Sequence, residues 1–164
     1  MTEQAGAETG IGHVTAHLDQ LGIAYEVVEH PRGLTAAAEA RAAGVTPENA
    51  AKAVVLRDAD GFRLAVVPAS ERVDLHKLRE LLEAGKDLRL ASEQELEAEF
   101  PGFELGAIPP LGEMLPAAEI VDRRILAHER VLCNGGDHEH SVLLDPRDIV
   151  RASSAVEADI CEDG

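Results

Sequence analysis

The segment from Ala50 to Pro68 constrains the fold of this chain more than any other. Two runs rich in aliphatic and β-branched residues, Lys52 to Arg57 and Phe62 to Pro68, flank Asp60-Gly61. That pair is typical of tight hairpin turns, so the segment predicts a β hairpin. Its first strand sets the charge of Lys52 among apolar neighbours. Because a dry, unpaired charge costs on the order of several kcal/mol, we expect Lys52 to reach solvent or to meet an anion.

Composition favours a mixed fold with an aliphatic core. Of 164 residues, 45% are hydrophobic but only 2% are aromatic. This favours helices combined with strands over an aromatic-rich β sandwich, and the length suits one domain. We expect a mixed α/β (α+β) domain over residues 11–152, with flexible tails at 1–10 and 153–164. The second tail is expected because its acidic run lacks an apolar partner face.

Helix and strand signals alternate along the chain without a strict βαβ period. Thr35 is a typical helix cap, Ser92-x-x-Glu95 forms a capping box, and Gly22 and Gly44 are typical helix ends. With similar signals elsewhere, they predict helices at 13–21, 35–43, 75–84, 92–100 and 145–150. Strands are expected at 23–29, 88–90, 118–122, 130–133 and 141–144, in addition to the hairpin.

Charge and cysteine usage limit the partners. The net charge of −16 gives no electrostatic footprint for broad nucleic-acid binding, so any such contact must be local, and we expect no DNA partner. No apolar stretch approaches the ~18 residues of a membrane span, so we expect no membrane contact. Cys133 and Cys161 are the two thiols, and no signal peptide is evident. We therefore expect a reducing compartment, the cytoplasm.

Two glycine segments could converge with Lys52 on one site. They are residues 106–110, Gly-Ala-Ile-Pro-Pro, and residues 134–140, Asn-Gly-Gly-Asp-His-Glu-His. Each can be an ordinary turn, and Lys52 can simply protect a strand edge from aggregation. Glycine backbone N–H groups can also approach a ligand closely and stabilise an oxyanion formed in acyl transfer. One cation with two such segments predicts a pocket for an anion or an ester.

Metal and covalent chemistry are the alternatives at these segments. Cys133, His138 and His140 carry zinc-ligating groups, but they match neither a CxxC nor an HExxH spacing. A partly exposed turn histidine is therefore favoured over a metal ligand. Ser141 and Cys133 lie in neither a GxSxG elbow nor a cysteine-hydrolase context, which disfavours a covalent intermediate.

The order of these features resembles the YbaK and prolyl-tRNA-synthetase-associated domain family of aminoacyl-tRNA deacylases. The resemblance runs from about residue 14 to 152. It rests on Tyr25 to His30, the helix led by Thr35, Lys52 in its strand, and the segments 103–112 and 134–138. It implies a mixed, barrel-like β-sheet flanked by helices, and hydrolysis of the ester that joins a wrong amino acid to tRNA. It also implies that no metal or organic cofactor is needed.

The resemblance implies a role for each matching residue. Lys52 matches the family lysine near the 3′-terminal adenosine, Gly106 belongs to the glycine–proline substrate loop, and His138 would orient the substrate or the water. These three form the implied catalytic set. The implied substrate-binding residues are Tyr25, His30, Thr35, Pro109, Asn134, Gly135, Gly136 and Ser141.

The resemblance also bears on substrate and partners. Residues 134–138 resemble the alanine-editing branch, and Ser141 stands near where cysteine-selective members often carry an acidic residue. This favours a small amino acid, such as alanine on the tRNA for proline. The expected partner is the acceptor end of an aminoacyl-tRNA, with an aminoacyl-tRNA synthetase as a second, delivering partner. The alternative is a binding module that keeps the fold, lacks catalysis, and docks tRNA, a synthetase or a nucleotide.

Overall fold

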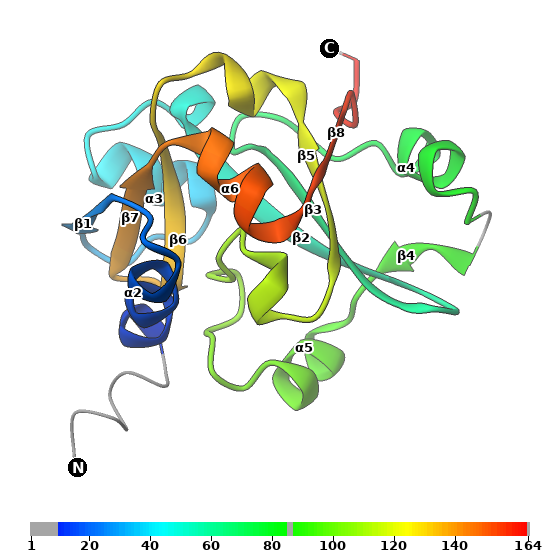
Figure 1. The fold of residues 1–164 in the computed structure, drawn as a ribbon, viewed down its shortest axis with the longest axis horizontal. Helices are drawn as coiled ribbons and strands as arrows, with labels where there is room; N and C mark the ends of the chain where they lie inside the picture. The colour runs from blue at the N-terminus through cyan, green and yellow to red at the C-terminus, as the bar shows by residue number, and fades with distance from the viewer. Residues whose placement is uncertain (1–9, 85–86, 164) are drawn as a thin grey trace.

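A mixed sheet of eight strands organises the part of the chain described in this computed structural model, residues 10–84 and 87–163 (Figure 1). The strand order is β1-β7-β6-β2-β3-β5-β8, and β4 pairs with β2. The strands are β1 Tyr25–Glu29, β2 Ala50–Asp58, β3 Gly61–Pro68, β4 Arg89–Leu90, β5 Ala118–Asp122, β6 Val131–Asp137, β7 His140–Leu144 and β8 Val156–Ala158. Strands β2 and β3 form the predicted hairpin, with Asp58 paired to Gly61.

The described residues form five α-helices. Figure 1 shows how they lie around the sheet. They are α2 Gly10–Leu21, α3 Ala36–Ala42, α4 Leu75–Leu82, α5 Glu93–Glu99 and α6 Pro146–Ser153, with short 3-10 helices at Pro47–Asn49, Gly112–Met114 and Arg123–Ala127. Two predicted caps are present. The Thr35 side chain accepts from the Ala38 N–H, and Ser92 and Glu95 form the full capping box. Within the described residues, no helix has the length and apolar character to cross a membrane.

Three apolar clusters hold the helices on the sheet. The main one packs Val14 and Leu18 of α2 and Ile149 of α6 against the inner face of the sheet. A second joins α4 to β3 and β5. In the third, Ala40 of α3 packs on Ala50 of β2 and on β6. Alanine side chains are short, so α3 lies close to the point where β2 and β6 meet.

The C-terminal segment differs from the expected flexible tail. Strand β8 pairs in parallel with β5, and Ile160 and Cys161 are fully buried. The Ile160 N–H donates to Asp122 Oδ2 at 2.8 Å. The prediction of a tail without an apolar partner is therefore wrong for residues 156–161, because Ala158, Ile160 and Cys161 pack into the apolar cluster of α4, β3 and β5. Residues 1–9 of the other expected tail lie outside the described residues.

Strands β2 and β6 separate soon after they meet, and this creates the candidate site. They pair in parallel only at Ala50 with Leu132 and at Ala51 with Cys133. Beyond that point β2 turns to pair with β4, while β6 continues beside β7 with a register shift between Asn134 and Asp137. The second glycine segment is thus part of a bulged strand, not the loop that the sequence suggested. Lys52 is the first β2 residue beyond the shared pairing.

Candidate functional site

A cavity of about 410 Å³ lies where β2 and β6 separate. Its lining comes from the loop and first residue of α3 at 32–36, from Lys52 and Ala53 of β2, from Leu105 and Gly106, and from His138. The structure thus places Lys52, Gly106, His138 and Thr35 around one hollow. These four were predicted as site residues from the sequence, and they come from four separate parts of the chain.

Lys52 supplies an unpaired cation to this cavity. Residues alternate faces along a strand, so Lys52 shares the face of Ala50, which α3 covers. It is partly buried and has no hydrogen bond or ion pair with any described residue. Burial, aided by the positive charge of Arg72, lowers the pKa of Lys52. The ammonium is therefore available to an anionic or hydroxyl group of a ligand.

The loop at Gly106 supplies a free backbone donor. Gly106 has φ +80°, a conformation that favours glycine, and a Cβ there would lie 3.3 Å from His138 Cε1. Its N–H has no acceptor among the described residues, whereas the next N–H, of Ala107, donates to the Glu104 carbonyl at 3.0 Å. The loop is held on β6 by the Gly136 N–H, which donates to the Ala107 carbonyl at 3.0 Å. Gly106 is thus exposed on a loop whose neighbours are fixed.

His138 lies between α3 and the Gly106 loop. Its Nδ1 is 2.8 Å from Glu39 Oε2, and its Nε2 is 2.5 Å from the Leu105 carbonyl oxygen. Burial lowers the pKa of His138, but the Leu105 carbonyl and the Glu39 carboxylate outweigh it, and the net shift is upward. Glu39 is 2% exposed and also accepts from Asn134 Nδ2 at 3.2 Å.

Glu39 is the residue that the sequence prediction missed. An acidic residue in a short alanine-rich helix is typical of a solvent-exposed face, and its partners are His138 and Asn134, far away in the chain. Glu104 was also missed, because its partners too lie far away in the chain. Its Oε1 accepts from the His138 N–H at 3.0 Å and from Arg32 at 3.2 Å. Within α3 no sequence signal distinguishes Glu39 from a solvent-exposed acid.

Four predicted residues support the site from behind its lining. Asn134 is buried and contacts Glu39. Gly135 and Gly136 are buried against α2, where added Cβ atoms would lie 2.7 Å from Ile11 Cδ1 and 2.8 Å from the Gly10 carbonyl. Pro109 is buried as well. None of the four lines the cavity. Their positions fit a role in holding the loops, and the expected contact with substrate gains no support from them.

His30 and Ser141 form a separate buried pair. The His30 Nε2 atom lies 2.8 Å from Ser141 Oγ, and Nδ1 lies 3.0 Å from the Pro31 carbonyl oxygen. Both side chains are at least nine-tenths buried, at 7% and 2% exposed. The pair ties the end of β1 to β7 beside the cavity, but neither residue lines it.

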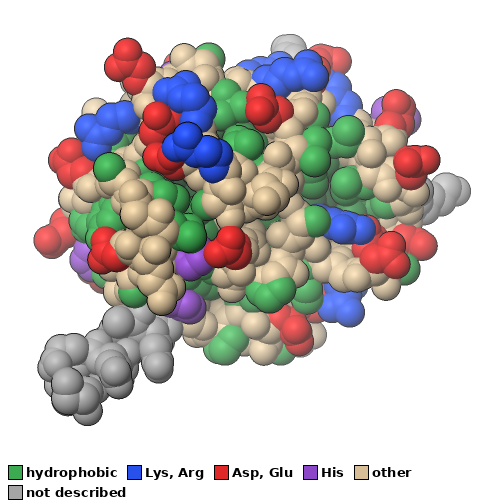
Figure 2. Space-filling view, viewed as in Figure 1, with side chains coloured by type: hydrophobic (Ala, Val, Ile, Leu, Met, Phe, Trp, Pro, Cys, Tyr) green, Lys and Arg blue, Asp and Glu red, His purple; other side chains and the backbone are tan. Residues whose placement is uncertain are grey.

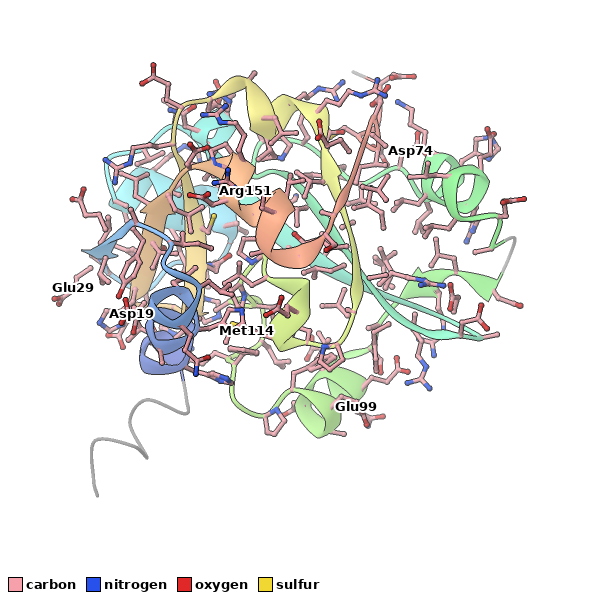
Figure 3. The ribbon with its side chains drawn as sticks, viewed as in Figure 1. Asp19, Glu29, Asp74, Glu99, Met114 and Arg151 are labelled. Carbon is pink, nitrogen blue, oxygen red and sulfur yellow. The ribbon has the colours of Figure 1, made fainter. Side chains whose placement is uncertain are left out.

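Tyr25 lies away from the cavity. Its hydroxyl donates to Asp19 Oδ1 of α2 at 2.9 Å, and Asp19 is labelled at that helix in Figure 3. Tyr25 begins β1 and pairs with Leu144 of β7, at the opposite end of these strands from His30. The structure therefore gives Tyr25 a structural contact and no contact with the lining.

The metal alternative has no ligand set in the described part of the chain. Residues 10–84 and 87–163 contain no group of three or more His, Cys, Asp or Glu side chains placed to hold a metal ion. Cys133 is buried, and burial raises the pKa of its thiol. His140 Nδ1 instead contacts Asp137 Oδ1 at 2.9 Å.

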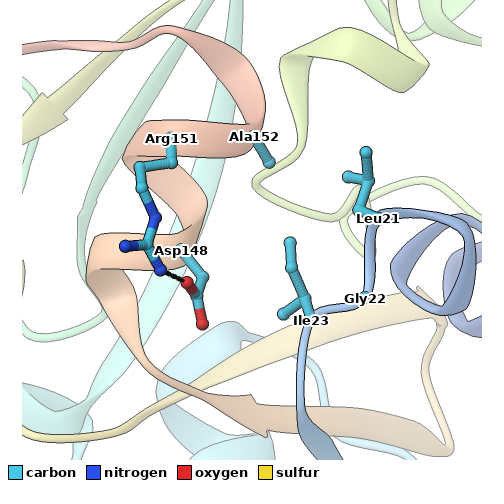
Figure 4. Close-up of a pocket in the computed structure, with 6 residues that line it drawn as sticks. All are labelled: Leu21, Gly22, Ile23, Asp148, Arg151 and Ala152. Atoms are coloured by element: carbon cyan, nitrogen blue, oxygen red, sulfur yellow. Dashed lines mark hydrogen bonds and ion pairs between the residues drawn. The ribbon is translucent and has the colours of Figure 1, made fainter.

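A second hollow, drawn in Figure 4, lacks comparable chemistry. It measures about 380 Å³ and lies between the end of α2 and helix α6. Its charged groups, Arg151 and Asp148, are bonded to each other. Arg147 and Arg130 nearby are also paired with carboxylates, and in Figure 2 blue side chains lie among red ones on this face. Among the described residues that line this hollow, none offers a free cation or a free glycine N–H.

Comparisons with known proteins cover the part of the chain that forms the cavity. A sequence profile of the aminoacyl-tRNA editing domain matches residues 30–152, which include all four lining segments. A search of curated proteins found no match.

Three solved structures share the fold. A candidate trans-editing enzyme for prolyl tRNA synthetase has a TM-score of 0.82 at 28% identity, over 93% of this chain and 97% of the other. Hypothetical protein APE2540 has 0.80 at 29%, over 91% and 99%. A structure from work on grafting epitopes onto scaffold proteins has 0.83 at 27%, over 94% and 97%. The predicted mixed α/β fold and family resemblance are confirmed: the chain belongs to the aminoacyl-tRNA editing domain family.

Proposed function

We propose that this protein hydrolyses the ester bond between an amino acid and the 3′-terminal ribose of a mischarged tRNA. The observation that carries the proposal is that Lys52, which has no ion-pair partner among the described residues, and the free N–H of Gly106 line the same cavity. An ester at the end of an anionic chain offers both a carbonyl to polarise and an anion to bind. The family supplies the chemical class of the substrate.

The reaction needs no nucleophile from the protein. A water oxygen attacks the carbonyl carbon, the carbon–ribose oxygen bond breaks, and the water proton ends on the ribose oxygen that leaves. Ser141 is engaged by His30, and Cys133 is buried with a raised pKa, so neither is placed to form an acyl intermediate. Water is therefore the nucleophile in this proposal.

Gly106 and Lys52 have complementary tasks. The Gly106 N–H would donate to the oxyanion that forms on the carbonyl oxygen, and one such donor is worth about 2.7–4 kcal/mol. Lys52 would bind a phosphate or hydroxyl of the terminal nucleotide and hold the ester in place. Thr35 caps α3 through its side chain and lines the same cavity, where it would contact the amino acid or the ribose.

The cavity suits a small amino acid on an acceptor end. It must hold the aminoacyl group with part of the ribose within about 410 Å³. Alanine on the tRNA for proline is the substrate we favour, since one similar structure is a candidate trans-editing enzyme for prolyl tRNA synthetase. The charge of −16 limits tRNA contact to this local area, so a synthetase that delivers the tRNA is a suitable partner. The reaction belongs to translation and thus to the cytoplasm.

The test is a deacylation panel. Purified protein is incubated with tRNAs mischarged with alanine, cysteine, serine and other small amino acids, and the fraction of intact ester is followed in time. We expect alanyl-tRNA for proline to lose its ester fastest. Lys52→Ala should remove most of the activity at unchanged thermal stability, whereas Arg41→Ala, which removes an exposed cation of α3 outside the cavity, should not.

Two outcomes would contradict the proposal. Normal turnover by Lys52→Ala would refute the role of the lysine. Saturable binding of the whole panel without ester cleavage would show that the chain is a binding module of the same fold.

A further inference from the structure

We propose that Glu39 fixes His138 as a ring that donates from both nitrogens and thereby clamps the Gly106 loop, so that both residues act by positioning and neither serves as a base. The kinetic part of this inference rests on the proposed hydrolase function. The structural part does not.

The acceptors around His138 define its state. Glu39 Oε2 and the Leu105 carbonyl oxygen face the two ring nitrogens at 2.8 and 2.5 Å. A carbonyl oxygen can only accept, and so can a carboxylate. A neutral imidazole carries one N–H, so it can satisfy only one of these contacts. Both contacts together require the doubly protonated ring, the imidazolium.

Glu39 is built to keep that charge in place. It is 2% exposed, and Oε2 also accepts from the Gly33 N–H at 3.2 Å while Oε1 accepts from Asn134 Nδ2. These donors fix the carboxylate from two sides. A buried carboxylate held this way needs a cation, and His138 is the cation that contacts it.

The other charges around His138 do not reverse this. The backbone N–H of His138 donates to Glu104 Oε1 at 3.0 Å. Glu104 is also paired with Arg32, whose positive charge opposes protonation of the His138 ring. Asp137 and His140 on the adjoining strands are paired with each other. Lys52 lines the same cavity but is not among the charges that shift the pKa of His138. Glu39 and the Leu105 carbonyl outweigh burial and Arg32, and the pKa of His138 is raised.

The clamp acts directly on the proposed oxyanion donor. Leu105, whose carbonyl accepts from Nε2, precedes Gly106, and the ring lies against the Gly106 Cα, where a Cβ would meet Cε1 at 3.3 Å. With both nitrogens protonated, the ring has no lone pair to accept a proton from water. Loss of one proton would break one of the two contacts and release either α3 or the loop.

The structural test needs only the wild-type protein. Nitrogen-15 NMR of the His138 ring should show both nitrogens protonated at pH 7, and a titration midpoint above the usual value of 6.5. In Glu39→Gln the midpoint should fall. The matched control is Glu80→Gln, which alters an exposed His–Glu pair on α4, His76 with Glu80 at 2.6 Å, and should leave the His138 signals unchanged. A neutral His138 ring at pH 7 in the wild type would overturn the inference.

The kinetic test separates positioning from binding. Glu39→Gln should lower kcat by about 10- to 100-fold, the loss typical of a small misplacement of a catalytic group, with little change in KM. Glu80→Gln should keep wild-type kinetics. Wild-type kcat, corrected for uncatalysed hydrolysis, should fall as pH rises through the His138 midpoint found by NMR. A kcat that instead rises across that midpoint would identify His138 as a base. If no tRNA is deacylated, the proposed function fails, but the NMR result still decides the clamp.

Discussion

Glu39 and Glu119 are both buried carboxyl groups that accept a backbone N–H, yet only Glu39 also contacts a side chain that can carry a positive charge. Glu39, beside the cavity, is 2% exposed and meets His138, Asn134 and the Gly33 N–H. Glu119, on β5, is 3% exposed and accepts one hydrogen bond, from the Gly112 N–H at 2.6 Å. Its Oε2 has no hydrogen-bond partner among the described residues.

The surroundings of Glu119 determine its protonation state. Burial raises the pKa of Glu119 to about 8, against the opposing effect of the Gly112 N–H, so this side chain is mostly a neutral acid at pH 7. Glu39 keeps a cation at contact distance. Burial alone therefore does not mark a functional carboxylate. A better indication is a positively charged partner that also lines the cavity, as His138 does for Glu39.

Identical substitutions at the two positions give the largest expected contrast. Glu39→Gln places an amide against the His138 and Gly33 donors, and breaking a buried ion pair costs about 3–5 kcal/mol. Glu119→Gln keeps an oxygen for the Gly112 N–H and removes the cost of protonating the side chain when the protein folds at pH 7, so it should be neutral or stabilising. Urea unfolding at pH 7 measures both free energies. Equal losses at the two positions would mean that the difference in charge is not real.

The pH dependence of stability tests Glu119 by itself. Folded Glu119 holds its proton up to pH about 8, whereas unfolded it ionises near 4.5. Between these values the unfolded state binds fewer protons, so stability falls as pH rises, by roughly 2–4 kcal/mol from pH 5 to pH 8. Glu119→Gln should remove this decline. A wild-type curve that is flat over the same range, measured by urea unfolding, would show that Glu119 is not protonated.

The titration of His138 should change the stability less than that of Glu119, and the change should begin at a higher pH. Its pKa is raised in the folded state, so its contribution to stability is complete below the usual value of 6.5 and is lost as pH rises through the folded value. As pH rises through this range, Glu39→Gln should lose less stability than the wild type. Thermal unfolding in steps from pH 6 to 9 measures the difference, with Glu80→Gln as the control. Identical curves for Glu39→Gln and the wild type would mean that the pair adds nothing.

The sequence predicted those site residues that carry a local signal. Lys52 is a charge in an apolar run, Gly106 precedes a proline pair, and His138 follows two glycines. Each feature is unusual at its own position. All three line the same cavity, and their catalytic roles stay a prediction.

The residues that sequence reasoning missed depend on distant contacts. Glu39 reaches the cavity's surroundings only because β6 brings Asn134 and His138 to it, and no pattern within α3 indicates that approach. The error at residues 156–161 has the same cause, because β5 and α4 supply the apolar partners that the segment itself lacks. Tyr25 was predicted as a site residue only because of its place in the family pattern. In the structure its hydroxyl contacts Asp19, a residue close to it in the chain.

Leu34 gives the smallest expected effect and tests which side of the molecule meets the substrate. It is 99% exposed on the rim of the cavity, where an acceptor end would cover it. Leu34→Ala should leave stability within about 0.5 kcal/mol, since it removes no packing. It should raise KM a few-fold, because the ligand loses apolar area to bury. Leu90→Ala removes an exposed leucine, 54% exposed, from β4 outside the cavity lining and should change neither quantity. Equal KM values for both variants would mean that the acceptor end approaches from the side of Lys52 and leaves the 32–36 loop uncovered.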